Sequence, residues 1–139
     1  MTKKVLCAVD DTEHSKSAVA LATELAKATG AELTLLVVNV PIGGAGRGGI
    51  MAYVWEGPDL KRVLDGGAAI AKKAGVSDPK TESVKSRDVA RAIVIYAEEN
   101  DIDHIVVGTG GKGAGARLML GSVSSDVIAR AHCPVTVAR

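Results

Sequence analysis

The segment from Gly108 to Ser122, GTGGKGAGARLMLGS, carries the densest chemical signal in the chain, with six glycines in fifteen residues. Glycine lets the backbone approach a ligand closely, and successive free N–H groups form a nest that binds anions. The helical pattern that begins at Ser122 adds further free N–H groups and a partial positive charge. Because the segment also holds Lys112 and Arg117 and no acid, we predict that it binds phosphate. The Ser122 hydroxyl would cap the helix or reach the phosphate itself.

Two common phosphate-loop patterns do not fit this segment. A Walker A loop needs Ser or Thr after Gly-Lys, whereas Gly113 follows Gly111-Lys112. The pattern GxGxxG occurs at residues 108–113 and again at residues 44–49, so it has little weight here. The dinucleotide-binding context is also missing, because no acid ends the next strand about 20 residues on.

The elements that must position this loop alternate between two periodicities. Short apolar runs, typical of strands buried on both faces, predict strands at Lys4–Val9, Glu32–Val40, Asp103–Val107 and Pro134–Ala138. A short, more polar strand is expected at Thr81–Lys85. Apolar stripes with helical spacing predict helices at Thr12–Thr29, Pro58–Ala74, Asp88–Glu99 and Ser122–Ala131. Gly30 and Gly75 stand where helices commonly stop.

This alternation predicts the α/β class: one doubly wound, five-stranded parallel sheet in the order 3-2-1-4-5, with helices on both faces. We expect residues 1–139 to form a single domain. Ligands of such sheets lie beyond the carboxyl ends of the strands, at the switch point, here between the first and fourth strands. The loops after Val9 and Val107 should therefore meet at one site.

The glycine spacing Gly108-x2-Gly111-x9-Gly121-Ser122 resembles the signature of the universal stress protein family, in its ATP-binding branch. The start of the chain, Val5 to Ser15 (VLCAVDDTEHS), is similar to the family's first strand and acidic turn. The end, Gly121 to Arg139, looks like its last helix, Cys-Pro-Val turn and final strand. The resemblance covers nearly the whole chain.

The resemblance implies a nucleotide-binding set of Ala8, Val9, Asp10, Val38, Gly108, Thr109, Gly111, Gly121, Ser122 and Val123. The glycines and Ser122 would hold the phosphates of ATP, with Mg²⁺ bound through them. Asp10 would contact the nucleoside end and Val38 would line the adenine pocket. Asp10 also follows a buried strand, where a carboxylate can accept from a ribose hydroxyl or an adenine amine; its alternative role is capping the helix. We predict no catalytic residue and no protein metal ligand.

Two positions depart from the family pattern. Asp10-Asp11-Thr12 stands where the family usually has Asp-Gly-Ser. Asp11 would cap the helix, hold a divalent metal or weaken ATP binding, and we favour capping, for which Thr12 is the other candidate. Arg87 stands where a glycine is common; contact with phosphate is one hypothesis, and a solvated side chain is the favoured one.

The glycine-rich segment Pro41–Gly57 is long for a connection between a strand and a helix. We expect it to be irregular. One hypothesis is a mobile surface loop; the other is a lid over the ligand, or a partner-binding patch around Met51, Tyr53 and Trp55.

The expected function is that of a dimeric, nucleotide-binding regulatory protein with little or no ATP turnover, because no residue stands as a general base. The dimer would pair strand 135–138 with its mate, as the resemblance implies. The alternatives are a protein-interaction module without nucleotide, or a binder of AMP or a cyclic nucleotide. Related adenylyl-transferring enzymes use SGGxDS or HIGH motifs, and neither occurs here.

Composition excludes several other functions. A net charge of +1 gives no field for nucleic acid or membranes, and an aromatic content of 2% leaves no platform for stacking bases. The N-terminus has no signal-like apolar stretch, so we expect a cytoplasmic protein with reduced Cys7 and Cys133. His14, His104 and His132 lack metal-ligand spacing and are expected to be structural or exposed.

Overall fold

A computed structural model describes residues 2–42, 52–109 and 122–139. Its main sheet consists of β1 (Lys4–Ala8), β2 (Glu32–Asn39), β5 (Lys80–Lys85), β6 (His104–Gly108) and β7 (Val135–Ala138). The helices are α1 (Glu13–Thr29), α2 (Gly57–Lys73), α3 (Val89–Glu99) and α5 (Val123–Arg130).

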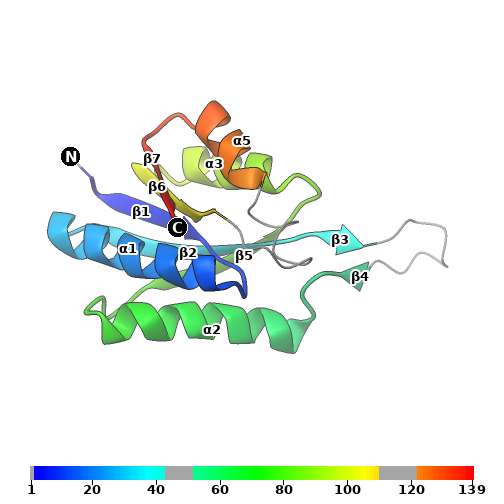
Figure 1. The fold of residues 1–139 in the computed structure, drawn as a ribbon, viewed down its shortest axis with the longest axis horizontal. Helices are drawn as coiled ribbons and strands as arrows, with labels where there is room; N and C mark the ends of the chain where they lie inside the picture. Colours follow the sequence, from blue (N-terminus) through cyan, green and yellow to red (C-terminus); the bar gives the residue numbers. More distant parts are fainter. Residues whose placement is uncertain (1, 43–51, 110–121) are drawn as a thin grey trace.

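The strands are all parallel and follow the spatial order β5-β2-β1-β6-β7. Since β5, β6 and β7 are the third, fourth and fifth strands of this sheet along the chain, the predicted order 3-2-1-4-5 is confirmed. Helices α1 and α2 cover one face, and α3 and α5 cover the other (Figure 1). The switch point lies between β1 and β6.

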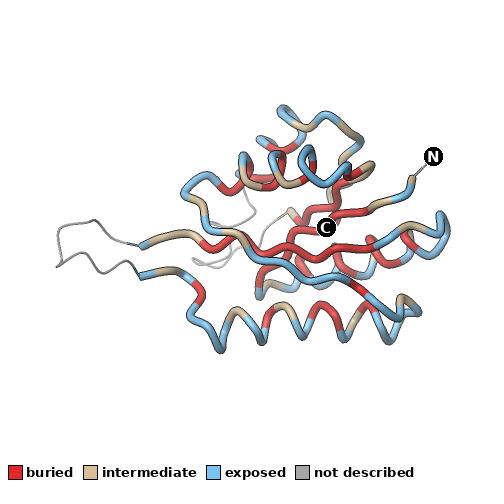
Figure 2. The backbone as a smooth tube through the Cα atoms, turned by 180° about the vertical axis from the view of Figure 1, so that it is seen from behind, coloured by how far each residue is buried: buried red, intermediate tan, exposed pale blue. Residues whose placement is uncertain are grey.

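Burial explains why the apolar runs became strands. The centre of the sheet is buried along β1, β2 and β6, whereas the edge strand β5 is mostly exposed (Figure 2). The stripe Ala18, Ala22 and Ala26 lets α1 pack closely on this sheet. At the helix ends, Gly30 and Gly75 take positive φ angles of 69° and 115°, which favour glycine.

The segment expected to be irregular contains regular structure. β3 (Pro41–Ile42) pairs with β4 (Ala52–Tyr53) as an antiparallel two-stranded arm that projects beyond the main sheet (Figure 1). The Lys85 ammonium lies 4.7 Å from the centre of the Tyr53 ring. The hypotheses of a mobile loop or a lid fall largely on residues 43–51, including Met51, which lie outside the described residues.

The hypothesis of a partner-binding patch does not hold for Trp55, which is 8% exposed and belongs to the core. The buried Asn39 side chain causes this: its amide donates to the Trp55 carbonyl and its oxygen accepts from the Trp55 N–H, both at 2.9 Å. These two bonds hold the chain against the end of β2. The Trp55 ring therefore packs inward.

Among residues 2–42, 52–109 and 122–139, no helix has the length and hydropathy needed to cross a membrane. Cys7 is buried and Cys133 is half-buried, and both are free thiols. Burial raises the pKa of each thiol. Raised thiol pKa values favour the unreactive protonated form.

Two adjacent glycines inside α2 have different surroundings, which gives a stability prediction. A Cβ added at Gly66 meets no atom within 4 Å, whereas one added at Gly67 lies 3.1 Å from the Leu35 Cδ1 in the core. Gly66→Ala should raise the free energy of unfolding by about 1 kcal/mol through helix propensity alone. Gly67→Ala gains the same propensity but overpacks the core, so it should not stabilise the protein. Urea denaturation measures both, and equal stabilisation by the two variants would contradict this packing.

Candidate functional site

The turn that follows β1 is closed by a hydrogen-bond network of three side chains. The Asp10 Oδ1 accepts from the Thr12 N–H at 2.8 Å and from the Thr12 hydroxyl at 2.6 Å. The Thr12 Oγ1 in turn accepts from the Ser15 N–H at 3.1 Å, and the Ser15 Oγ accepts from the Asp10 N–H at 2.9 Å. These bonds reverse the chain and start α1.

Asp10 is 6% exposed, yet its second oxygen, Oδ2, has no hydrogen-bond partner among the described residues. Burial raises the pKa of this carboxyl group. The hydrogen bonds from Thr12 oppose the rise in the pKa, the Asp11 charge adds to it, and the His14 side chain opposes it. A buried acceptor without a partner costs about 1–3 kcal/mol, so this atom is a candidate ligand contact.

Thr12, and not Asp11, caps α1. Its side chain accepts from the Ser15 N–H, and its backbone has the extended conformation of an N-cap residue. The prediction that Asp11 caps the helix is therefore wrong. Asp11 is exposed, and the carboxylate that holds Thr12 is that of Asp10.

The ends of β1 and β6 meet as the switch-point argument predicted. The Thr109 hydroxyl lies 3.0 Å from the His14 Nδ1, which links the end of β6 to the first turn of α1. A Cβ on Gly108 would lie 2.8 Å from the His14 carbonyl oxygen. Glycine is thus required at position 108 by the packing of α1, apart from any contact with phosphate.

Of the other residues predicted to hold phosphate, the structure describes only Ser122 and Val123. Ser122 and Val123 lie at the start of α5, where Val123 is buried. Ser122 occupies the N-cap position with a helical backbone, and its hydroxyl makes no capping hydrogen bond, so its predicted capping role is wrong. Gly111 and Gly121, like Lys112 and Arg117, lie outside the described residues.

The predicted nucleoside set lies on β1 and β2. Ala8 is the last residue of β1 and pairs with Leu36; the Val9 N–H donates to the Leu36 carbonyl. Strand β2 continues to Asn39, so Val38 lies two residues after Leu36. At this level the neighbouring chain has already left β1 and turns at Asp10. Val38 lies near the carboxyl end of β2, where it pairs with Val84 of β5, and Asp10 follows the carboxyl end of β1 at the same edge of the sheet.

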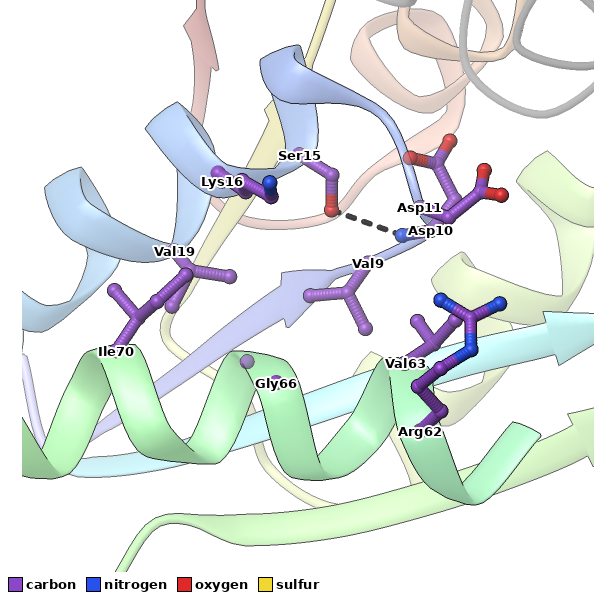
Figure 3. Close-up of a pocket in the computed structure, with 11 residues that line it drawn as sticks. Val9, Asp10, Asp11, Ser15, Lys16, Val19, Arg62, Val63, Gly66 and Ile70 are labelled. Atoms are coloured by element: carbon purple, nitrogen blue, oxygen red, sulfur yellow. Dashed lines mark hydrogen bonds between the residues drawn. The ribbon is translucent and has the colours of Figure 1, made fainter. Parts of the chain in front are cut away.

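A cavity of about 250 Å³ opens beside Asp10, between α1 and α2 (Figure 3). Its lining residues are Val9, Asp10, Asp11, Ser15, Lys16, Val19, Arg62, Val63, Gly66, Gly67 and Ile70. Sequence analysis missed the part that α2 contributes. The available signal was Gly66-Gly67 within a helical pattern, which indicates a packing or functional requirement.

The surroundings of Arg87, His104 and His132 do not indicate a binding role for these side chains. Arg87 and His132 are exposed, and the His104 Nε2 lies 2.7 Å from the Thr136 Oγ1. Burial lowers the pKa of His104, which favours its neutral form. Within the described residues, no three His, Cys, Asp or Glu side chains gather as a metal site.

Comparison with known proteins agrees with this fold. The sequence profile of the Universal stress protein family matches residues 1–139. The chain belongs to the universal stress protein family. A family member from Thermus aquaticus is 34% identical over 143 residues, which cover 100% of each chain. A Mycobacterium tuberculosis member is 40% identical over 86 residues, and this match spans only 29% of that longer protein.

Solved structures of other universal stress proteins are also similar. One in complex with cAMP has a TM-score of 0.76 and 25% identity, over 99% of this chain and 97% of that one. One from Archaeoglobus fulgidus in complex with dAMP has a TM-score of 0.70 and 25% identity, over 99% and 98% of the chains.

The raised pKa of Asp10 gives a pH-dependent prediction for this universal stress protein. The folded state holds the Asp10 proton more tightly than the unfolded chain, so stability is lost as the pH rises from about 4, near the ordinary carboxyl pKa, through the raised value. Asp10→Asn avoids this loss and keeps an oxygen for Thr12. The variant should therefore unfold at higher urea than the wild type at pH 7, with a smaller difference at pH 4. Asp11→Asn, at the exposed neighbour, is the control, and a difference that does not change with pH would contradict the prediction.

Proposed function

We propose that this universal stress protein binds an adenine nucleotide beyond the carboxyl ends of β1 and β6. The observation that carries the proposal is the buried Asp10 carboxylate, whose Oδ2 has no partner among the described residues. It lies at the switch point, where the β1 turn meets Thr109. The relatives solved with cAMP and dAMP support an adenine nucleotide as the ligand class.

In the proposed complex, Asp10 accepts a hydrogen bond from the nucleoside, and Val38, Ala8 and Val9 form the apolar wall on which the base rests. The phosphates lie toward Gly108, Thr109 and the start of α5, where Ser122 and the Val123 N–H donate to them. Gly111 and Gly121 complete the phosphate contacts. The free N–H groups of a helix start favour a bound anion.

We propose that residues 1–139 act as one nucleotide-binding domain and that its ligand is ATP with Mg²⁺ held through the phosphates; AMP and cyclic nucleotides are the competing ligands. The proposed role is regulatory and cytoplasmic, with little or no ATP turnover. Ser122 is exposed and its hydroxyl makes no capping bond, so it is available to a phosphate without loss to the helix.

We also propose a homodimer formed through β7. This strand is an edge of the sheet, and an uncovered edge is a surface for strand pairing. The carbonyls of Pro134 and Ala138 accept from β6, at Ile105 and Thr109. Because residues of a strand alternate in the direction of their backbone groups, Val135 and Val137 direct theirs to the free edge.

Thermal unfolding with added nucleotide tests the binding site. A ligand at 100 times its Kd adds about 2.7 kcal/mol, which for a chain of this length raises Tm by about 5–11 °C. ATP–Mg²⁺ or AMP should produce this shift and GTP should not. Ser122→Ala should lose most of the response to ATP and AMP and keep its response to adenosine, because it removes a phosphate contact only.

Ser125→Ala is the matched control, since Ser125 is exposed on the same helix and lies three residues after Ser122. It should respond like the wild type. Bound nucleotide carried over from expression is removed beforehand and identified by its absorbance at 260 nm. The proposal fails if the nucleotide-free protein shows no shift with any adenine nucleotide.

Sedimentation tests the dimer. Val137→Pro removes one outward N–H of the edge strand, a position where proline is tolerated, so it should convert the dimer to a monomer. Val137→Thr keeps both the N–H and the β-branched shape, and should remain dimeric. A monomeric wild type, or a dimeric Val137→Pro variant, would exclude β7 pairing.

A further inference from the structure

The cavity between α1 and α2 has an apolar interior. Val9 forms its floor at the end of β1, Val19 lies on the α1 side, and Val63 and Ile70 lie on the α2 side (Figure 3). At about 250 Å³ it is smaller than the pockets that hold drug-sized ligands, which start at roughly 300 Å³. Its size suits a short aliphatic molecule.

Gly66 lines this space. It lies within α2, where glycine costs about 1 kcal/mol relative to alanine. Its φ is not positive, and a Cβ at this position would meet no atom within 4 Å, so neither backbone strain nor close packing among the described residues requires glycine. Gly66 is exposed and lines the cavity, so a larger side chain here would lie at the mouth of the cavity. The helix thus gives up stability at a position beside the cavity.

The open end of the cavity is acidic. The carboxylates of Asp10 and Asp11 lie at this end, with the Arg62 guanidinium facing them (Figure 3). The two nearby cations already have acidic partners on their own helices: Lys16 pairs with Glu13 at 3.0 Å, and Arg62 pairs with Asp59 at 3.6 Å. The carboxylates of Asp10 and Asp11 are therefore in excess over the positive charges.

Asp10 is the least satisfied of these groups. It is almost fully buried, and its Oδ2 lacks a partner among the described residues. An ammonium group placed here would supply both a hydrogen-bond donor and a compensating charge. Hydrogen bonds to charged groups contribute about 1.5–3 kcal/mol each.

From the apolar interior, the open Gly66 position and the acidic end, we infer that the α1/α2 cavity binds a small aliphatic amine, with its hydrocarbon chain beside Gly66 and its ammonium group at Asp10 and Asp11. This site lies on the α1/α2 face of the sheet, whereas the proposed phosphate contacts lie toward β6 and α5. The two sites share only the Asp10 carboxylate and the neighbouring Val9, and the amine site does not rest on the proposed nucleotide function.

Titration of the full chain by two-dimensional ¹H–¹⁵N NMR tests the inference with the 3-methylbutylammonium ion as probe. Saturable shifts are expected at the amides of Val9, Val63, Gly66 and Gly67. The isosteric anion 4-methylpentanoate should bind at least about tenfold more weakly, because it lacks the charge-assisted bond to Asp10. Equal binding of the two ions, or no saturable shift with the amine, overturns the inference.

Filling the cavity gives the second test. Gly66→Leu should abolish amine binding, and Gly66→Ala, the variant least disturbing to the fold, should weaken it. Gly57→Leu is the matched control, because its Cβ also meets no atom within 4 Å and it lies outside the cavity. Amine binding retained by Gly66→Leu would overturn the inference.

Nucleotide binding separates this inference from the proposed function. Gly66→Leu should bind AMP as the wild type does. If it loses AMP together with the amine, the cavity belongs to the nucleotide pocket and the separate amine site is excluded. If the wild type binds the amine and no nucleotide, the amine site stands and the proposed nucleotide function fails.

Discussion

The reversal of the chain after β1 depends on one carboxylate oxygen. The Asp10 Oδ1 accepts from both the backbone and the hydroxyl of Thr12, and this fixes Thr12 as the residue that caps α1. The Ser15 hydroxyl completes the network by accepting a hydrogen bond from the Asp10 N–H. The position at which α1 begins then sets where His14 meets Gly108 and Thr109, so the same oxygen determines the contact between α1 and the end of β6 at the switch point.

This arrangement leaves the other oxygen of Asp10 buried and without a partner in the described part of the chain. Burial destabilises the ionised carboxylate, and the two hydrogen bonds from Thr12 to Oδ1 offset part of this cost. Two proposed binding regions adjoin the same side chain: the ends of β1 and β6, and the cavity between α1 and α2. Gly108 permits close packing of α1 in the first, whereas Gly66 leaves open space in the second.

The fold was predictable because its central strands, β1, β2 and β6, are buried on both faces and its helices on one. Continuous apolar runs such as Lys4–Ala8 and striped segments such as Glu13–Thr29 then differ clearly in period. The meeting of Asp10 with the end of β6 followed from parallel strands ending at one edge. The burial of Trp55 could not be predicted in this way. It depends on the Asn39 side chain, sixteen residues earlier, which forms hydrogen bonds with both the N–H and the carbonyl of Trp55.

The sequence by itself determined the order of the strands, the family and the place of Asp10 at the switch point, since periodicity and motif spacing are properties of the chain alone. Tertiary structure decided that Thr12 caps α1, that Ser122 does not use its hydroxyl as a cap, and that Gly66 adjoins open space while Gly67 contacts Leu35. Neighbouring residues of the same type differ in these roles because each role depends on backbone angles and on atoms from distant elements. Distances between such atoms are set only when the helices pack on the sheet.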